Sequence, residues 1–156
     1  MESCRNEHFC DDDDLVMPLV ETIAKVGASV AFHTGGDAPD QTSPYRVGRI
    51  AKLFPEMKIL MVHIGCGGSS YDLSRSAIEV AKECPNVWLV GSDIRTRPLL
   101  NAAKALGSER ICFGSDAPFE NMKVELARYR AMFETDLPAA DYENIMSGNI
   151  LRFLAR

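Results

Sequence analysis

The sequence predicts one α/β domain built on a parallel sheet of four strands, and three observations support this. A length of 156 residues suits a single domain. Segments with helical spacing of apolar residues separate four short apolar runs, which lie near residues 28–33, 58–63, 87–91 and 111–115. The runs recur about every 25 to 30 residues. Strands separated by helices of this length pair in parallel through right-handed crossovers. Because the runs lack polar alternation, we expect both faces of the sheet to be covered.

The composition is that of an ordinary globular protein, with 46% hydrophobic and 25% charged residues. A net charge of -5 argues against nucleic acid or an anionic membrane as a partner. No apolar run approaches the ~20 residues of a membrane span, and no segment resembles a signal peptide, so we expect a cytoplasmic protein. The five cysteines are irregularly spaced and are expected as buried thiols. Metal binding by Cys4, His8 and Cys10 is disfavoured because their spacing is not that of zinc sites.

The N-terminal part is expected to be a polar segment, residues 1–14, followed by the α/β domain, residues 15–156. Within the segment, Asp11–Asp14 is predicted to be solvated at a helix N-terminus, where acidic side chains suit the helix dipole. The first helix has Pro18 in its first turn, where a missing N–H is tolerated, and ends at Gly27. Its predicted buried stripe is Leu15, Leu19, Ile23 and Val26.

A helix follows each predicted strand. Ser43 and Pro44 suit the first positions of the second helix, Pro98 begins the fourth, and Asp141 begins a short helix near the end. The positions predicted to face the core are Val47, Ile50, Ala51 and Phe54; Leu73, Ala77, Val80 and Ala81; Leu99, Ala102, Ala103 and Leu106; and Met122, Leu126, Tyr129 and Phe133.

Three residues that suit metal chemistry follow the predicted strands directly. His33, His63 and Asp116 each stand where a strand ends. The carboxyl ends of parallel strands meet at one rim, so these side chains are expected on the same rim. Imidazole and carboxylate groups are good ligands for Zn, Fe or Mn. Each residue alone is also compatible with a structural role, such as an Asx turn at Asp116. The equivalent positions of two of the three histidines favour a metal site.

A competing interpretation is a dinucleotide site at the glycine-rich segment GCGGSS, residues 65–70. It follows a strand and precedes a helix, and Asp93 follows the next strand, as in a dinucleotide fingerprint. The pattern is disfavoured because Ser70 stands where the third glycine belongs and His63 would point into the phosphate site. The sequence contains no Gly-Lys-Ser or Gly-Lys-Thr and therefore no P-loop.

Five segments together resemble the C-terminal half of the amidohydrolase-related family, the metal-dependent (β/α)8 TIM barrels of the amidohydrolase superfamily. The matching segments are VAFHTG at 30–35, FPEMKILMVHIG at 54–65, CPNVWL at 84–89, GSERICFGSDAPF at 107–119 and NIMSGN at 144–149. The resemblance covers about residues 15–155, in the order and at the spacing of the family.

The resemblance implies that the four strands are the last four of the barrel. It also implies that His33 and Asp116 bind a divalent metal, with zinc as the first expectation, and that Asp116 is catalytic. His63 is implied either to bind a second metal or, when only one metal is present, to act as a catalytic group. In such a site Asp116 takes the proton of the attacking water. The implied reaction is hydrolysis of a small amide, lactone or ester, or alternatively decarboxylation. The loops at 34–37 and 65–70 are expected to line the substrate pocket, and Arg95 and Arg97 are candidates for binding a substrate carboxylate.

The main departure from the family is the absence of a His-x-His pair and of any residues for the first four strands. A full barrel needs ~250 residues, and a half sheet leaves two apolar edges open. We therefore expect a homo-oligomer, or a partner chain that completes the barrel. The alternative function is that of a truncated, non-catalytic relative that serves as a structural or binding subunit.

Overall fold

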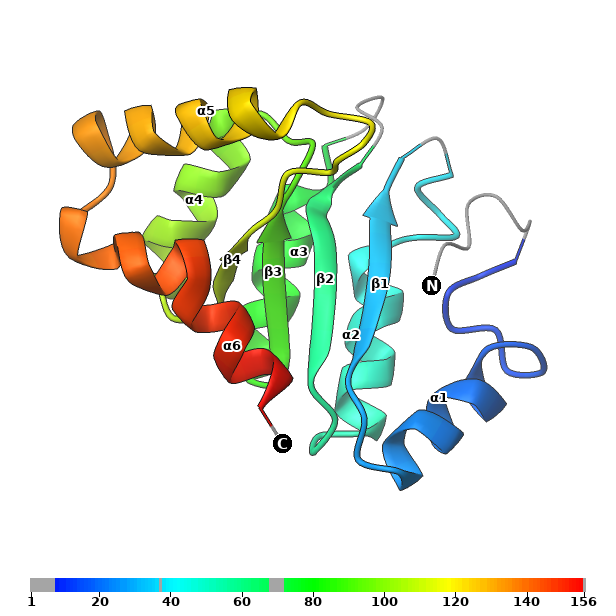
Figure 1. The fold of residues 1–156 in the computed structure, drawn as a ribbon. Coiled ribbons are helices and arrows are strands. Elements are labelled where there is room, and N and C mark those ends of the chain that lie inside the picture. The colour runs from blue at the N-terminus through cyan, green and yellow to red at the C-terminus, as the bar shows by residue number, and fades with distance from the viewer. Residues whose placement is uncertain (1–7, 37, 68–71, 156) are drawn as a thin grey trace.

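The structure is a computed structural model and describes residues 8–36, 38–67 and 72–155. Its centre is a four-stranded parallel sheet in the order β1-β2-β3-β4 (Figure 1). The strands are β1 (Val30–Gly35), β2 (Ile59–Gly67), β3 (Val87–Gly91) and β4 (Ile111–Phe113). The helices are α1 (Met17–Lys25), α2 (Pro44–Leu53), α3 (Ser74–Glu83), α4 (Thr96–Leu106), α5 (Met122–Thr135) and α6 (Asn149–Leu154). A 3₁₀ turn, η2 (Ala139–Asp141), and a π turn, η3 (Asn144–Gly148), precede α6. The predicted α/β fold with four parallel strands is confirmed.

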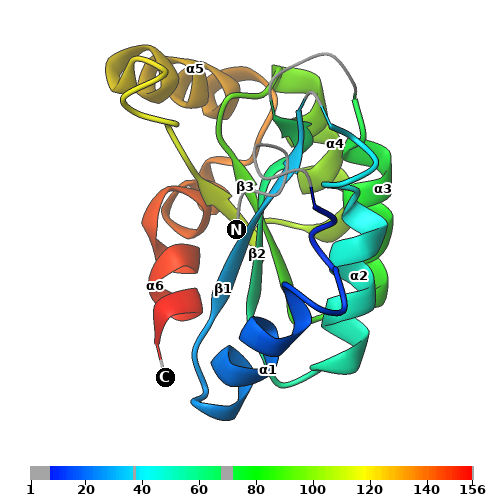
Figure 2. The same ribbon diagram turned by 90° about the vertical axis from the view of Figure 1, so that its right-hand side faces the viewer.

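The helices lie on both faces of the sheet but cover them unequally. Helices α2, α3 and α4 pack on one face, and α6 lies on the other (Figures 1 and 2). On that second face the Phe153 ring of α6 lies 5.9 Å from the Trp88 ring of β3, centroid to centroid. Among the helices in the described ranges, none is long and apolar enough to cross a membrane.

The two faces of the strands differ in burial. The side chains that face α2, α3 and α4 are almost fully buried: Phe32, Ile59, Met61, Val87, Leu89 and Ile111. On the opposite face Ala31 is exposed, and Leu60, Val62 and Trp88 are only half-buried. The expectation of a sheet covered on both faces is therefore wrong for this face, because α6 reaches only part of it.

The predicted core positions are right for the central helices and mostly wrong for α1. Val47, Ile50 and Ala51 of α2 are buried as expected, as are Ala77, Val80, Ala81, Leu99 and Ala102 in α3 and α4. Near α1, Ile23 packs against the core as expected, but the other core contacts come from Val16, Met17 and Val20. The remaining predicted residues are exposed, Leu15 by 62%, Leu19 by 56% and Val26 by 69%. In α5, Tyr129 is buried and Phe133 packs against the core as expected, whereas Met122 is exposed and Glu125 and Met132 are buried. The sequence periodicity marked an apolar face of α1 that no described element covers.

The segment before α1 is more ordered than its composition predicts. Asp11 is buried and forms ion pairs with Arg46 at 2.8 Å and with Arg49 at 3.3 Å, both from α2. Asp13 and Asp14 are exposed as expected, although Asp13 also pairs with Arg49. The solvated interpretation is therefore wrong for Asp11: two arginines at one end of α2 compensate its burial.

A repeated side-chain clamp joins successive βα units at the N-terminal end of the sheet. The Asn86 Nδ2 group donates to the carbonyl oxygens of residues 51, 54 and 57 at 3.0–3.1 Å. Thirty residues further along the chain, the carbonyl oxygens of residues 81, 84 and 87 accept hydrogen bonds from Arg110 Nη1 at 2.7–3.1 Å. In each clamp two of the carbonyl groups, 51 and 54 or 81 and 84, lie at a helix C-terminus, where intrahelical partners are lacking, and the third lies at the beginning of the next strand region. The internal repeat in the sequence therefore has a structural counterpart.

We expect Asn86→Ala to lower the free energy of unfolding by about 1–3 kcal/mol, because it leaves part-buried carbonyl groups without donors. Urea denaturation measures this change. The matched control is Asn101→Ala, at an exposed position of α4, which should stay within about 0.5 kcal/mol of the parent protein. Equal effects of the two substitutions would contradict the clamp.

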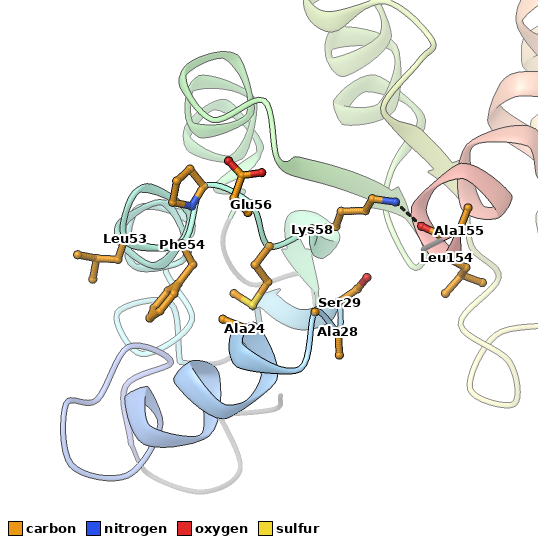
Figure 3. Close-up of a pocket in the computed structure, with 12 residues that line it drawn as sticks. Ala24, Ala28, Ser29, Leu53, Phe54, Glu56, Lys58, Leu154 and Ala155 are labelled. Carbon is orange, nitrogen blue, oxygen red and sulfur yellow. Dashed lines mark hydrogen bonds between the residues drawn. The ribbon is translucent and has the colours of Figure 1, made fainter.

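Lys58 directly precedes β2, as Asn86 precedes β3 and Arg110 precedes β4, but its side chain binds the end of a different helix, α6. Its Nζ group donates to the carbonyl oxygens of Arg152 at 2.9 Å and Ala155 at 2.6 Å, at the end of α6 (Figure 3). Between this lysine and the ends of α1 and α2 lies a cavity of about 640 Å³, with Ala24, Phe54 and Leu154 in its walls. The cavity lies at the N-terminal end of the strands, and parallel α/β barrels have their active sites at the opposite end.

The buried thiols predict a loss of stability in alkaline solution. Burial raises the pKa of Cys10, Cys66 and Cys112 to about 12. Above about pH 9 the thiols ionise in the unfolded chain but stay protonated in the folded one, so each thiol lowers stability by ~1.4 kcal/mol per pH unit up to about pH 12. The free energy of unfolding of Cys112→Ala should be measured by urea denaturation between about pH 9.5 and 11, between the pKa values of the thiol in the unfolded and folded chains. Its decrease with pH should be shallower than that of the parent protein by this amount. An unchanged slope would contradict the burial of this thiol.

Candidate active site

The residues predicted to form the site meet at the carboxyl rim of the sheet. The rings of His33 on β1 and His63 on β2 form an edge contact with their centroids 4.8 Å apart. His63 Nε2 lies 3.9 Å from Oδ1 of Asp116, which follows β4. His63 is buried, whereas the side chain of Asp116 is 26% exposed. The structure thus brings together three residues that lie far apart in the sequence.

The backbone is strained at this rim. Four non-glycine residues have left-handed backbone conformations: His63 at φ 68°, Ile64 at 49°, Asp93 at 44° and Asp116 at 58°. His63 and Ile64 lie within the last part of β2, whereas Asp93 and Asp116 follow β3 and β4. Such conformations cost on the order of 1–3 kcal/mol each and persist where surrounding structure imposes them, most often at functional sites.

The hydrogen bonds of His63 determine its tautomer. Nδ1 lies 2.8 Å from the carbonyl oxygen of Ser92 and 3.1 Å from its hydroxyl oxygen. A carbonyl oxygen can only accept, so Nδ1 of the neutral imidazole must carry the proton. Nε2 then presents its lone pair on the side of Asp116. Ser92 therefore orients a ligand or base, a role that no motif around it indicated.

Glycines make room for the two imidazoles. A Cβ atom added at Gly67 would lie 2.7 Å from His63 Cδ2 and 2.8 Å from His33 Nε2, and one at Gly36 would lie 3.2 Å from that same nitrogen. Gly67 belongs to the segment that resembled a phosphate loop. Its residues 65–67 end β2, and the small size of Gly67 is required by the histidines. Residues 68–70 and Asp37, which were predicted to line the pocket, lie outside the described residues.

Thr34 ties the first two strands together at the rim. Its buried hydroxyl donates to the carbonyl oxygen of Val62 at 2.5 Å and accepts from the N–H of Gly65 at 2.9 Å. These two bonds bridge the kink that His63 and Ile64 introduce into β2. The threonine was expected to face substrate, but its hydroxyl group forms hydrogen bonds with the backbone instead.

The donor set suits a divalent metal, but the described residues do not by themselves form a three-ligand cluster. Two imidazoles and a carboxylate are ligands for Zn or Mn. In residues 8–36, 38–67 and 72–155 taken alone, no three His, Cys, Asp or Glu side chains converge as a metal cluster. His33 contacts His63, and His63 in turn lies 3.9 Å from Asp116. Cys4 of the alternative N-terminal set lies outside the described residues.

A second cavity, of about 510 Å³, lies at the same end of the sheet. Arg95 and Asp93 from the loop after β3 line it, together with Cys66 and two residues of α5, Glu125 and Arg128. Arg95 therefore lies where a carboxylate could be bound, whereas Arg97 is not part of the lining described for this cavity.

The parallel βα units and the histidine–carboxylate rim place the chain among proteins of the (β/α)8 barrel class. Residues 5–156 match the family described as Amidohydrolase. Because this match spans nearly the whole chain, the chain belongs to the amidohydrolase family, as the resemblance implied. No curated protein matches it significantly.

Solved structures show the same fold. An uncharacterized TIM-barrel protein from Bordetella bronchiseptica has a TM-score of 0.77 and 23% identity, with 92% of this chain and 51% of that chain covered. An amidohydrolase from Burkholderia multivorans with bound Zn has a TM-score of 0.70 and 17% identity, covering 92% and 58%. A dihydroxybenzoic acid decarboxylase from a Polaromonas species with bound manganese has a TM-score of 0.64 and 20% identity, covering 94% and 55%. The chain therefore spans about half the length of these proteins and forms half of a barrel.

Proposed function

We propose that this chain contributes the C-terminal half of a metal-dependent active site that acts on a small carbonyl substrate. The observation that carries the proposal is His63: it is buried on strained backbone, its Nε2 lone pair is held towards Asp116, and His33 lies against its ring. Membership of the amidohydrolase family supports the same chemistry.

The residues divide into ligands and proton carriers. His33 and Asp116 would hold a divalent metal, which is zinc or manganese in two structures of the same fold. Such a metal, when bound, makes water acidic enough to provide hydroxide near neutral pH and polarises a carbonyl group. Asp116 accepts the proton of the attacking water, and His63 exchanges a proton with the substrate oxygen through Nε2. Ser92 keeps this nitrogen available by holding the other one.

Decarboxylation is the second candidate. One structure of the same fold is a dihydroxybenzoic acid decarboxylase, and Arg95 lines the rim cavity, where a guanidinium group suits a carboxylate. Hydrolysis of an amide, lactone or ester remains the first candidate, because water activation uses both Asp116 and His63.

Elemental analysis tests the proposal. Purified protein, incubated with Zn²⁺ or Mn²⁺ and then desalted, should retain metal stoichiometrically and lose it in His33→Ala and Asp116→Ala. The loaded protein is then assayed on a panel of amides, lactones, esters and aromatic carboxylates. Absence of retained metal in the unmodified protein would contradict the proposal and favour a non-catalytic subunit.

A further inference from the structure

Helix α5 is connected to the candidate active site through a buried tyrosine. The helix lies at the carboxyl end of the sheet, on the side of β4 (Figure 1). Its residue Tyr129 is fully buried, and the tyrosine hydroxyl donates a hydrogen bond of 2.6 Å to the carbonyl oxygen of Gly91. Burial raises the pKa of this hydroxyl, so the group stays protonated and remains a donor. Gly91 ends β3 and directly precedes Ser92, whose carbonyl group holds His63.

The end of β3 is shaped for this hydrogen bond. A Cβ atom added at Gly91 would overlap the hydroxyl oxygen of Tyr129, so only glycine, which has no Cβ, allows the tyrosine to approach so closely. A second bond from α5 fixes the same loop further along, because Arg128 donates to the carbonyl oxygen of Ile94. The two bonds fall on either side of Ser92 in the sequence. Helix α5 therefore restricts the position of this serine from both directions.

The same tyrosine also contacts the strand that leads to Asp116. Its ring forms an edge contact with the ring of Phe113, the last residue of β4, with the centroids 4.9 Å apart. The next residue, Gly114, lies against Ser92, since an added Cβ would lie 2.8 Å from the Cβ of that serine. One buried side chain thus contacts both the support of His63 and the strand before Asp116. These two groups face each other across 3.9 Å.

We infer that α5 positions His63 for the proposed chemistry, with Tyr129 as the principal positioning residue and Arg128 as a second one. The tyrosine hydroxyl fixes the carbonyl group of Gly91 and with it the adjoining residue, Ser92. The hydrogen bond made by one ring nitrogen of a histidine determines which nitrogen carries the proton. With Ser92 held in place, the proton stays on Nδ1 and the Nε2 lone pair remains free for proton exchange. The role in catalysis rests on the proposed function, whereas the effect on the tautomer does not.

The tautomer of His63 is tested by ¹⁵N NMR of the labelled, metal-free protein at about pH 8.5, above the ordinary histidine pKa of ~6.5. The chain has three histidines, and His63→Asn identifies the signals of His63 by their loss. In the unmodified protein the proton should be on Nδ1. Tyr129→Phe keeps the ring and removes only the hydroxyl group. It should raise the ratio of Nε2-protonated to Nδ1-protonated His63 at least about 3-fold, as expected when one hydrogen bond is weakened.

The matched control is Tyr45→Phe. The hydroxyl of Tyr45 also donates a hydrogen bond of 2.6 Å, to Glu79, but on the exposed surface of α2. Its removal should leave the signals of His63 unchanged. A Tyr129→Phe protein that folds and keeps the tautomer of the unmodified protein would overturn the inference, however much less stable it is. The hydroxyl would then contribute only to stability.

Arg128→Lys provides the test if Tyr129→Phe does not fold. Lysine keeps the positive charge that the buried Glu125 requires. Its single ammonium group cannot reproduce the planar fork with which arginine binds both Glu125 and the carbonyl oxygen of Ile94. The ratio of the two tautomers of His63 should again rise, and an unchanged ratio in this variant would overturn the inference.

The consequence for catalysis is measured on the metal-loaded protein with the substrate found in the panel. Tyr129→Phe should lower kcat about 10-fold and leave KM within about 2-fold, because it alters the protonation of a catalytic group and not the contacts of the substrate. A changed tautomer with an unchanged kcat would overturn the catalytic role of this positioning. A changed tautomer in a protein that turns over no compound of the panel would contradict the proposed function and leave the positioning of His63 standing.

Discussion

Asp116→Asn should reduce turnover of the substrate found in the panel about 1000-fold, within the ~10²–10⁴ range of general acid–base catalysis. Asparagine preserves the shape of the side chain and tolerates the left-handed backbone at φ 58°. It removes the negative charge that faces His63 Nε2 across 3.9 Å and the capacity to accept a proton. Steady-state kinetics on the metal-loaded protein measures the effect, with kcat expected to fall more than KM rises.

Asp93→Asn is the matched control for this prediction. Asp93 also follows a strand on the rim and also has a left-handed backbone, at φ 44°. It lines the neighbouring cavity with Arg95, and its substitution should change kcat less than about 10-fold, as expected of a group that exchanges no proton with the substrate. If the two variants lost activity equally, Asp116 would have no special role as the proton acceptor.

Gly35→Ala should destabilise the fold by about 2–5 kcal/mol. Gly35 ends β1 at φ 85°, and an added Cβ would lie 2.6 Å from the carbonyl oxygen of Gly65 and 2.8 Å from the N–H nitrogen of Gly67. The left-handed backbone contributes about 1–2 kcal/mol of this cost, and overpacking against rigid backbone contributes about 1–3 kcal/mol. Urea denaturation followed by circular dichroism measures the loss.

Gly27→Ala separates the two contributions. Gly27 has a comparable left-handed φ of 65°, but no atom lies within 4 Å of an added Cβ. Only the backbone cost of about 1–2 kcal/mol should remain. Equal destabilisation by the two substitutions would show that the close approach of β1 to the end of β2 contributes nothing.

Local sequence patterns were sufficient to predict the α/β order, the parallel sheet and the rim positions of His33, His63 and Asp116. Strand–helix alternation restricts the topology strongly, and parallel topology then places every strand end on the same rim. These inferences need only chain order and periodicity. The apolar stripes of α2, α3 and α4 were predicted correctly for the same reason, because each of these helices packs directly on the sheet.

Only the tertiary structure decided which face of α1 is buried and how the rim is built. The periodicity of Leu15, Leu19 and Val26 marks an apolar face but cannot say whether anything covers it. The tautomer of His63 depends on a carbonyl oxygen 29 residues away, and the need for glycine at position 67 depends on two histidines from different strands. Such properties arise from contacts between segments distant in the sequence. Side-chain periodicity therefore determines the elements, whereas packing between them decides which groups meet and which apolar faces remain open.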